Sequence, residues 1–510
     1  MTSTHKLDLP RDRVNTQVQK LHQQGNDSAF RGEHDRAIGY YTQALAIDPN
    51  FVSAYCARGG SEIELKNYAQ AKTDYAMALK LSPALAVADG GLARAYYGDR
   101  DYQTALIACN RAIQNDPDNL DFYYYRALIN QKLADYDRIL LDCKFLLERQ
   151  PSDISIRWLN ARAHFQLGNY QLALFNFSQY LNLKLDDAYA YYYRGICYER
   201  LNHLPQALQD LNRAIDLKDD LAIFHRRRGR IAQLLGDFTS AMTDYHTAIS
   251  LDPQMAQAYV NRADIYLSRG DYSRALIQCN QAIQIDPGLV SAHYQRGMIN
   301  TEVGNLHAAL ADYHRLIQLN PQDLNAYLQR GWIYFRHGEY TAVMNDCEQI
   351  LTLFGGATSW AVAKPMPQQP CLPAQKENRH FIAANYLMGV VQSLSGFKQE
   401  AIFSFTKAID AKPNFISALY HRGLLHYDLR HEDQATNDFQ LAQAIQNQGL
   451  DSITERDETG LYAEGLALYY MGQLETARSI FYQAVVVSQK LKSAVFHQQI
   501  MFTIEALDMI

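Results

Sequence analysis

The sequence predicts an all-α fold, a solenoid in which antiparallel helix pairs stack one on the next. Three observations predict it. A unit of one helix, a short break and a second helix recurs every 34 residues, as the spacing of Gly195 and Gly229 illustrates. Small residues recur where two helices must come close. Proline or another helix stop recurs after the second helix. Neither helix can bury a core alone, so every unit requires neighbours.

The segment Ala222–Met255 shows the unit well, and Ala222 is taken as frame position 1. We expect a first helix over Ala222–Leu235 and a second over Phe238–Ser250, with the break at Gly236 between them. Pro253 cannot continue the second helix, which therefore ends before it.

Ten contiguous copies of this frame run from Val18 to Ala357, and position 8 is small in all of them: Gly25, Gly59, Ala93, Ala127, Ala161, Gly195, Gly229, Ala263, Gly297 and Gly331. Proline stands at position 32 in seven copies: Pro49, Pro83, Pro117, Pro151, Pro253, Pro287 and Pro321. The pattern resembles the tetratricopeptide repeat (TPR) family. The resemblance implies a right-handed superhelix whose first helices line a concave groove, with frame positions 2, 5, 9, 12 and 13 pointing into it.

The predicted order along the chain has five parts. A polar leader covers 1–17, ten repeats cover 18–357, an insertion covers 358–381, three further repeats cover 382–491, and a capping helix covers 492–510. The cap is expected because four apolar residues fall on one helical stripe that can cover the last repeat: Phe496, Ile500, Ile504 and Leu507.

The insertion contains four prolines, Pro365, Pro367, Pro370 and Pro373, which exclude a helix through its middle. It can be a joint between two groups of repeats, a polyproline-like segment bound by another protein, or a flap that returns to the groove. Trp360, one of three tryptophans, is the reason to keep the flap among the alternatives.

Composition excludes several classes of function. A net charge of −6 and a pI near 6.2 argue against nucleic acid held by bulk charge. The N-terminus lacks a signal-peptide core and no apolar run reaches membrane-spanning length, so a cytoplasmic protein is expected. We found no catalytic, cofactor or metal motif, and we expect no enzyme. Four cysteines share position 24, where we expect buried thiols rather than disulfides: Cys109, Cys143, Cys279 and Cys347.

An arginine and an aspartate recur together across the two helices of a repeat. Arg occupies position 7 in eight repeats: Arg58, Arg126, Arg194, Arg228, Arg262, Arg296, Arg330 and Arg422. Asp occupies position 23 in seven of these: Asp74, Asp142, Asp210, Asp244, Asp312, Asp346 and Asp438. Repeats without the Arg also lack the Asp. We therefore predict an ion pair between the helices of one repeat; the alternative is that both are ordinary surface charges.

The first repeat resembles co-chaperone TPR domains that hold a C-terminal carboxylate. Of the five side chains that such a clamp requires, only Asn26 matches. The other four positions carry His22, Ala57, Val87 and Gly91. The sequence therefore argues against a carboxylate clamp at this end.

The concave positions of repeats three to seven are rich in arginine and aromatic residues. They carry six bases (Arg94, Lys132, Arg162, Arg200, Arg226, Arg230) against two acids (Asp121, Glu199), a balance of +4 in a protein of net charge −6. Such a groove suits an extended, acidic and partly apolar segment of a partner protein. The alternative is that the aromatic residues only pack on their neighbours. The predicted partner-binding residues are Tyr124, Lys132, Trp158, Arg162, Tyr192, Arg200, Arg226 and Arg230.

Later repeats offer a second, more apolar groove: Trp332, Phe335, Tyr386, Tyr420, Tyr427, Tyr462 and Tyr469. Because repeats account for nearly the whole chain, we expect a non-catalytic scaffold or assembly factor that binds protein partners. The alternative is a structural subunit that self-associates through its ends. Oligomeric state and the identity of the partner do not follow from the sequence.

Overall fold

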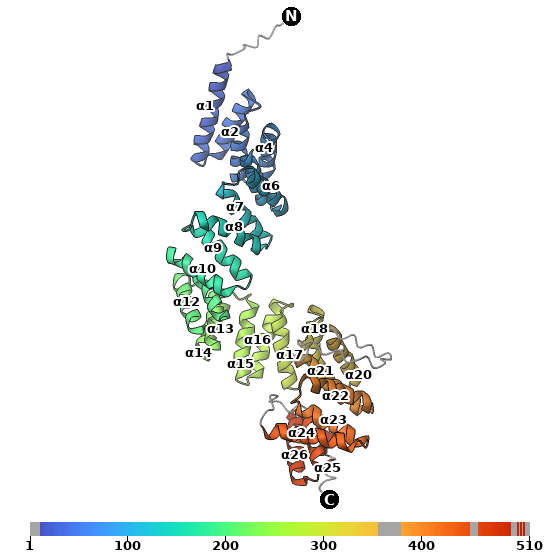
Figure 1. The fold of residues 1–510 in the computed structure, drawn as a ribbon. Coiled ribbons are helices and arrows are strands. Elements are labelled where there is room, and N and C mark those ends of the chain that lie inside the picture. The colour runs from blue at the N-terminus through green and yellow to red at the C-terminus, as the bar shows by residue number, and fades with distance from the viewer. Residues whose placement is uncertain are drawn as a thin grey trace. The chain divides into compact units, whose positions relative to one another are not determined.

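The computed structural model describes residues 11–354, 379–448 and 457–490, together with residues 497–498, 500–501 and 503–504 near the C-terminus. These residues are helical apart from short turns, and no strand occurs among them. The chain divides into two compact units, Met1–Asp244 and Tyr245–Ile510. Within each unit the helices follow one another in chain order (Figure 1). The expected all-α solenoid of helix pairs is confirmed.

Unit 1 contains the first seven helix pairs, the last of which crosses its boundary. Its helices are α1 (Arg11–Phe30), α2 (His34–Ile47), α3 (Val52–Glu64), α4 (Tyr68–Leu81), α5 (Ala86–Gly98), α6 (Tyr102–Asn115), α7 (Leu120–Lys132), α8 (Tyr136–Arg149), α9 (Ile154–Gln166), α10 (Tyr170–Leu183), α11 (Ala188–Arg200), α12 (Leu204–Leu217), α13 (Ala222–Leu234) and α14 (Phe238–Leu251).

Unit 2 continues the same alternation. Its helices are α15 (Ala256–Ser268), α16 (Tyr272–Ile285), α17 (Val290–Glu302), α18 (Leu306–Leu319), α19 (Leu324–His337), α20 (Tyr340–Leu353), α21 (Arg379–Leu394), α22 (Lys398–Ala411), α23 (Ile416–Asp428), α24 (Glu432–Asn447), α25 (Glu458–Tyr470) and α26 (Leu474–Lys490).

A left-handed residue at frame position 15 joins the two helices of every repeat. Eight repeats use glycine there: Gly32, Gly168, Gly236, Gly270, Gly304, Gly338, Gly396 and Gly472. Five use another residue: Lys66, Arg100, Ala134, Asn202 and Arg430. A positive φ ends the first helix and turns the chain sharply into the second. Since this backbone mark occurs once per repeat, the described residues contain thirteen repeats.

In several repeats position 8 is small because an aromatic ring from the second helix lies against it. At Gly59, an added Cβ atom would come within 2.9 Å of the Tyr75 ring, closer than carbon atoms pack. Tyr75 is itself 4% exposed. Small and large residues thus interlock between the two helices, and buried side chains continue this packing into the next repeat.

The predicted Arg–Asp ion pair is confirmed. In repeat seven, Nη2 of Arg228 donates to Oδ1 of Asp244 at 2.7 Å, and Nε donates to Oδ2 at 2.9 Å. The other six pairs have the same bidentate form: Arg58–Asp74, Arg126–Asp142, Arg194–Asp210, Arg296–Asp312, Arg330–Asp346 and Arg422–Asp438. Arg262 donates to Gln278 instead, at 2.6 Å. The aspartates are buried while the arginines are partly exposed.

The same arginine also reaches back to the preceding repeat. Nη1 of Arg228 donates to Oδ1 of Asn212 in α12 at 3.0 Å. Five further arginines donate in the same way to a side-chain oxygen of the preceding second helix. The pairs are Arg58–Thr42, Arg126–Asn110, Arg194–Ser178, Arg296–Asn280 and Arg422–Thr406. Each of these arginines therefore ties three helices together, two from its own repeat and one from the repeat before.

The structure revises one boundary predicted from the sequence and supports part of the predicted cap. Helix α1 begins at Arg11 rather than at Val18, so the last part of the predicted leader is helical. Trp360 and the four prolines of the insertion lie outside the described residues, and so do Phe496 and Leu507. Ile500 and Ile504 are buried in the core of unit 2, as a cap requires.

The position-24 cysteines are buried free thiols, as predicted. Burial raises the pKa of Cys109 and of Cys143 to about 12. The thiol of Cys109 donates to the carbonyl oxygen of Phe122 in the following helix at 3.2 Å. These thiols act as small packing groups between repeats.

Candidate partner-binding site

A cavity of about 300 Å³ lies between repeats four and five, beside the first helices α7 and α9. It combines apolar walls with amide and cationic groups: Tyr136, Ile139, Leu159 and Ala163, with Gln131, Lys132, Arg162 and Gln166. Lys132 and Arg162 are both predicted site residues. An apolar cavity with two cations suits a ligand that carries a carboxylate beside an apolar group.

Arg162 lies between aromatic rings and has no acidic partner. Its Cζ atom is 4.3 Å from the ring centroid of Tyr193 and 5.7 Å from that of Trp158. Its Nε atom is buried without a hydrogen-bond partner. Across the described ranges, neither Arg162 nor Lys132 forms an ion pair. The two cations at the cavity are therefore available to an external carboxylate.

Trp158 forms a fixed wall beside Arg162. Its ring lies edge-on to Phe177 at 5.7 Å and to Tyr193 at 5.9 Å, and it is tilted against Tyr180 at 5.2 Å. The indole is half-buried. Rings from α9, α10 and α11 thus hold one another in place, and a ligand would meet a surface that is already ordered.

Tyr192 does not belong to this surface. It is only 5% exposed, and its ring stacks on Phe224 of the next repeat at 4.9 Å. The prediction that its ring faces a partner is wrong, because the first helices of repeats six and seven pack closely enough to bury it.

Glu199 neutralises much of the predicted positive strip. Its Oε1 accepts from Nε of Arg230 at 3.0 Å, and its Oε2 accepts from Nη1 of Arg227 at 3.1 Å. In repeat three, Arg94 is paired with Glu64 at 3.1 Å in the same way. The balance counted from the sequence therefore overstates the charge available to a ligand; among the described residues of the predicted strip, Lys132, Arg162 and Arg200 form no ion pair.

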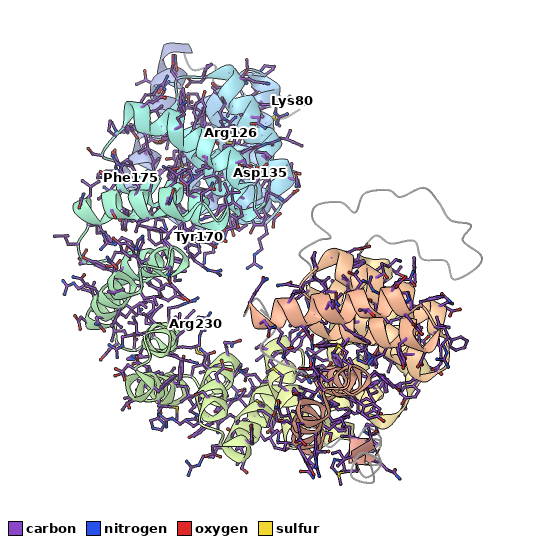
Figure 2. The ribbon with its side chains drawn as sticks, turned by 60° about the horizontal axis from the view of Figure 1, so that its bottom comes forward. Lys80, Arg126, Asp135, Tyr170, Phe175 and Arg230 are labelled. Atoms are coloured by element: carbon purple, nitrogen blue, oxygen red, sulfur yellow. The ribbon has the colours of Figure 1, made fainter. Side chains whose placement is uncertain are left out.

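The remaining predicted residues lie apart from the cavity. Arg200 is exposed, with its Cζ atom 5.7 Å from the ring centroid of Tyr170. Arg226 is half-buried on α13, and Tyr124 lies edge-on to Tyr125 at 6.3 Å. Figure 2 labels Tyr170 and Arg230, which come from α10 and α13. The structure thus brings together Lys132, Trp158 and Arg162 of the eight.

Sequence reasoning missed four contributors. Tyr193 and Arg227 stand at frame position 6, which is not among the positions expected to point into the groove. Gln131 and Gln166 stand at positions 12 and 13, within the expected groove, but a neutral amide carries no charge signal in the sequence. Only the spatial arrangement of α7, α9, α11 and α13 identifies them.

The later aromatic groove is closed in part. Tyr386 and Tyr420, at position 5 of repeats eleven and twelve, are 3% and 0% exposed. Tyr462 and Tyr469 belong to α25, which packs against α23. The prediction of an exposed ring is therefore wrong for Tyr386 and Tyr420, whereas Tyr427 remains 36% exposed.

Within the described ranges, no group of three His, Cys, Asp or Glu side chains is placed to hold a metal ion. No helix there combines the length and apolar composition that crossing a bilayer requires.

Comparison with known proteins matches the sequence of this chain to a repeat family. A sequence model of the tetratricopeptide repeat matches residues 56–120, 146–222, 226–290 and 294–342. Sperm-associated antigen 1 of Mus musculus is 32% identical over 95 residues, which is 19% of this chain and 10% of that protein. Small glutamine-rich tetratricopeptide repeat-containing protein 2 of Saccharomyces cerevisiae is 27% identical over 116 residues, or 22% of this chain and 34% of that protein. The chain thus spans a minor part of these relatives.

Solved structures include similar helical arrays. The C-terminal part of a TPR repeat-containing protein from Cytophaga hutchinsonii covers 51% of this chain and 97% of its own, with 17% identity and a TM-score of 0.40. A tetratricopeptide repeat protein from Parabacteroides merdae covers 46% of this chain and 94% of its own, with 19% identity and a TM-score of 0.36.

Proposed function

The chain belongs to the tetratricopeptide repeat family, and we propose that it is a non-catalytic scaffold or assembly factor that binds a partner protein on the first helices of repeats four to six. TPR domains bind protein partners, and this chain offers a prepared surface for one.

The cavity between α7 and α9 carries the proposal. Two cations without acidic partners, Lys132 and Arg162, line a cavity of about 300 Å³ that is otherwise apolar and amide-lined. Arg162 is half-buried beside these walls, so a ligand carboxylate would pair a charge that water reaches only in part, and the exposed Lys132 adds a second cation. An acidic and partly apolar segment, bound in extended form, fits this chemistry.

Two contacts of this kind are enough for a selective site. A charge-assisted hydrogen bond in a partly desolvated groove contributes about 1.5–3 kcal/mol, more than an exposed ion pair. The Trp158 and Tyr193 rings add apolar area that is already ordered. Binding should weaken as salt rises, because the Debye length shortens to about 8 Å at physiological ionic strength.

The test begins with selection of a displayed library of random short peptides on the purified full chain. We expect the selected peptides to combine acidic and apolar residues. The Kd of a selected peptide, measured by fluorescence anisotropy, should rise at least ~100-fold in Lys132→Glu/Arg162→Glu, since each lost contact costs about tenfold or more.

Two further variants locate the site. Arg213→Glu changes an exposed arginine of α12 and should leave the Kd unchanged. Arg226→Glu/Arg230→Glu should have a smaller effect than the cavity variant, because Glu199 already engages Arg230. Equal binding by the wild type and the cavity variant would exclude the cavity as the site.

A self-associating subunit remains the second candidate, and one feature of unit 1 favours it. Frame position 22 carries an exposed apolar side chain in three consecutive repeats. The exposed fractions are 61% at Ile107, 69% at Leu141 and 59% at Phe175; Figure 2 labels Phe175 on α10. A row of apolar side chains on second helices is the kind of surface that associates.

Sedimentation velocity over a dilution series distinguishes the two candidates. The scaffold proposal expects a single monomer boundary at all concentrations. Self-association expects faster sedimentation at higher concentration, reversed in Ile107→Ser/Leu141→Ser, whose side chains are mostly exposed and contribute little to folding.

We also propose a cytoplasmic location. The six cysteines within the described ranges are free thiols, which is usual in a reducing compartment. Fractionation of the source cells, with the chain followed by immunoblot, checks it; recovery from an oxidising compartment would contradict it.

A further inference from the structure

Helix α25 departs from the packing of the earlier repeats. In unit 2, the second helix of one repeat packs against the first helix of the next, as α20 does with α21 and α22 with α23. Helix α25 packs instead against α23, the first helix of repeat twelve, and not chiefly against α24. It therefore lies on the side of the array where the first helices are.

Contacts run along the whole length of α25. At its start, the hydroxyl groups of Tyr386 in α21 and Thr459 are 2.7 Å apart. At the next residue, a Cβ atom added at Gly460 would lie 2.8 Å from Cβ of Ser417 in α23, so the two backbones approach closely. At the far end, the ring of Tyr470 stacks on that of Tyr427 at 4.5 Å.

The groups that α25 contacts stand at the positions that line the binding surface in unit 1. Tyr386, Ser417 and Tyr427 occupy frame positions 5, 2 and 12 of repeats eleven and twelve. Tyr386 is 3% exposed beside the start of α25, and Tyr427 keeps 36% exposure beside its far end. Helix α25 thus lies against the groove positions of repeats eleven and twelve.

The interface recognises specific polar groups as well as apolar ones. Oδ1 of Asp457 accepts from the hydroxyl groups of Tyr386 at 3.2 Å and Thr459 at 2.9 Å, and from the backbone N–H of Gly460 at 2.6 Å. Gln446 of α24 donates to Oε1 of Glu464 at 3.0 Å. Buried polar contacts of this kind specify which helix fits a groove, beyond what apolar packing alone selects.

We propose that the first helices of repeats eleven and twelve form a helix-binding groove, that α25 is its resident ligand, and that a partner helix beginning with the same Asp-x-Thr-Gly pattern competes with α25 for it. This groove is separate from the cavity of unit 1, and the proposal does not depend on the function proposed there. Helix-in-groove recognition reads anchors at helical spacing. Here those anchors are the Asp457 carboxylate, the Thr459 hydroxyl, a small residue at 460 and the Tyr470 ring.

The test uses the full chain and a labelled peptide of residues 457–490 as the probe. In the wild type, the tethered α25 holds the groove at a high effective concentration, so the peptide should bind weakly. Gly460→Leu inserts a side chain where Ser417 leaves no space, and it should displace α25. We expect the peptide to bind this variant at least tenfold more tightly than the wild type, by fluorescence anisotropy.

Two variants control for position and for loss of structure. Gly39→Leu makes the same change on α2, where an added Cβ meets nothing within 4 Å, and it should bind like the wild type. Gly460→Leu/Tyr386→Phe removes the groove hydroxyl that contacts Asp457 and Thr459, and it should lose the gained affinity in part. Unchanged binding by Gly460→Leu, with helical content retained in circular dichroism, would overturn the proposal.

A reversible lock gives a second measurement on one protein. In Ser417→Cys/Gly460→Cys the two Cβ atoms start 2.8 Å apart, shorter than the roughly 3.5–4.5 Å of a disulfide, so an outward shift of α25 by about 1 Å brings them to the required separation. Oxidised, the chain should exclude the peptide; reduced, it should bind the peptide, because the side chain added at position 460 loosens α25. Equal peptide binding in the two states, with the disulfide verified by mass spectrometry, would also overturn the proposal.

Discussion

Arg126 in α7 holds the carboxylate of Asp142 in α8 through two guanidinium nitrogens, with Nη2 and Oδ1 2.6 Å apart. Its third nitrogen, Nη1, donates to Oδ1 of Asn110 in the preceding repeat at 3.0 Å. Arg126 is labelled in Figure 2. The Asp142 side chain is 3% exposed and that of Arg126 is 25% exposed. Burial raises the pKa of the Asp142 carboxyl even though Arg126 lowers it, so the carboxylate depends on this one cation.

Arg126→Ala should therefore destabilise repeats three and four by about 3–5 kcal/mol, because it strands a buried carboxylate. Asn110→Ala should cost under about 1.5 kcal/mol, since it removes one hydrogen bond at the edge of the pair. Urea unfolding followed by circular dichroism checks both. Arg213→Ala, at an exposed site of α12, is the matched control. Equal losses in Arg126→Ala and Arg213→Ala would contradict the role of the pair.

Repeat eight offers a natural contrast, because Arg262 donates to the neutral Gln278. Arg262→Ala leaves a buried amide rather than a buried charge, and it should cost about 1–3 kcal/mol. Hydrogen exchange of the two helices that carry each pair should show greater loss of protection for Arg126→Ala than for Arg262→Ala. The reverse order would contradict the account.

Ala134 and Gly168 occupy the same turn position in repeats four and five, with φ of 57° and 75°. A left-handed conformation costs a residue with a Cβ roughly 1–2 kcal/mol, while glycine loses more chain entropy on folding. We expect Ala134→Gly to raise stability by about 0.5–1 kcal/mol and Gly168→Ala to lower it by a similar amount. Thermal unfolding of the two variants measures both changes in stability. If both variants gained or both lost stability, the left-handed conformation would not explain the choice of residue at this turn.

His225 should make the seventh repeat sensitive to pH. The Asp244 carboxylate, whose Oδ1 lies 3.6 Å from Nδ1 of the ring, raises the pKa of His225 against the opposing effect of burial, and Nε2 lies 2.9 Å from the carbonyl oxygen of Asp219. The unfolded pKa is about 6.5. A raised folded pKa means that the stabilisation is fully present below about pH 6.5 and is lost as pH rises through the folded value.

Wild type and His225→Gln should therefore differ most in melting temperature near about pH 6 and differ least above about pH 8. Titration of the His225 ring by NMR gives its pKa directly. A value below about 6.5, or a difference in melting temperature that does not change with pH, would contradict the prediction.

The proline-rich insertion at 358–381 should be the first site of limited proteolysis. Its four prolines exclude a helix through its middle, and proteases cut backbone that is not held in a helix. Mass spectrometry should find two stable fragments, the larger from the N-terminal side. Early cleavage within a repeat, with the insertion intact, would favour the alternative in which it docks as a flap.

Much of this fold could be predicted from the 34-residue repeat, because the recurring residues contact one another within a single helix pair. Gly59 faces Tyr75 and Arg228 meets Asp244 within one helix pair, whose geometry is fixed by a short turn. Of the candidate site, the frame predicted Lys132, Trp158 and Arg162. It did not predict Tyr193 or the Glu199 pair with Arg230, which join residues of successive repeats and depend on how two pairs stack.

Helical periodicity and turn chemistry act over a few residues and recur from repeat to repeat, so the helix pairs, their number and the ion pair inside seven of them follow from the sequence alone. Only the tertiary structure decided which aromatic rings stay accessible. Trp158 and Tyr386 share frame position 5, yet one lies beside Arg162 of the open cavity and the other lies beneath α25. The position of α25 depends on contacts between residues 73 positions apart, such as Tyr386 with Thr459, and no periodic pattern encodes such a distance.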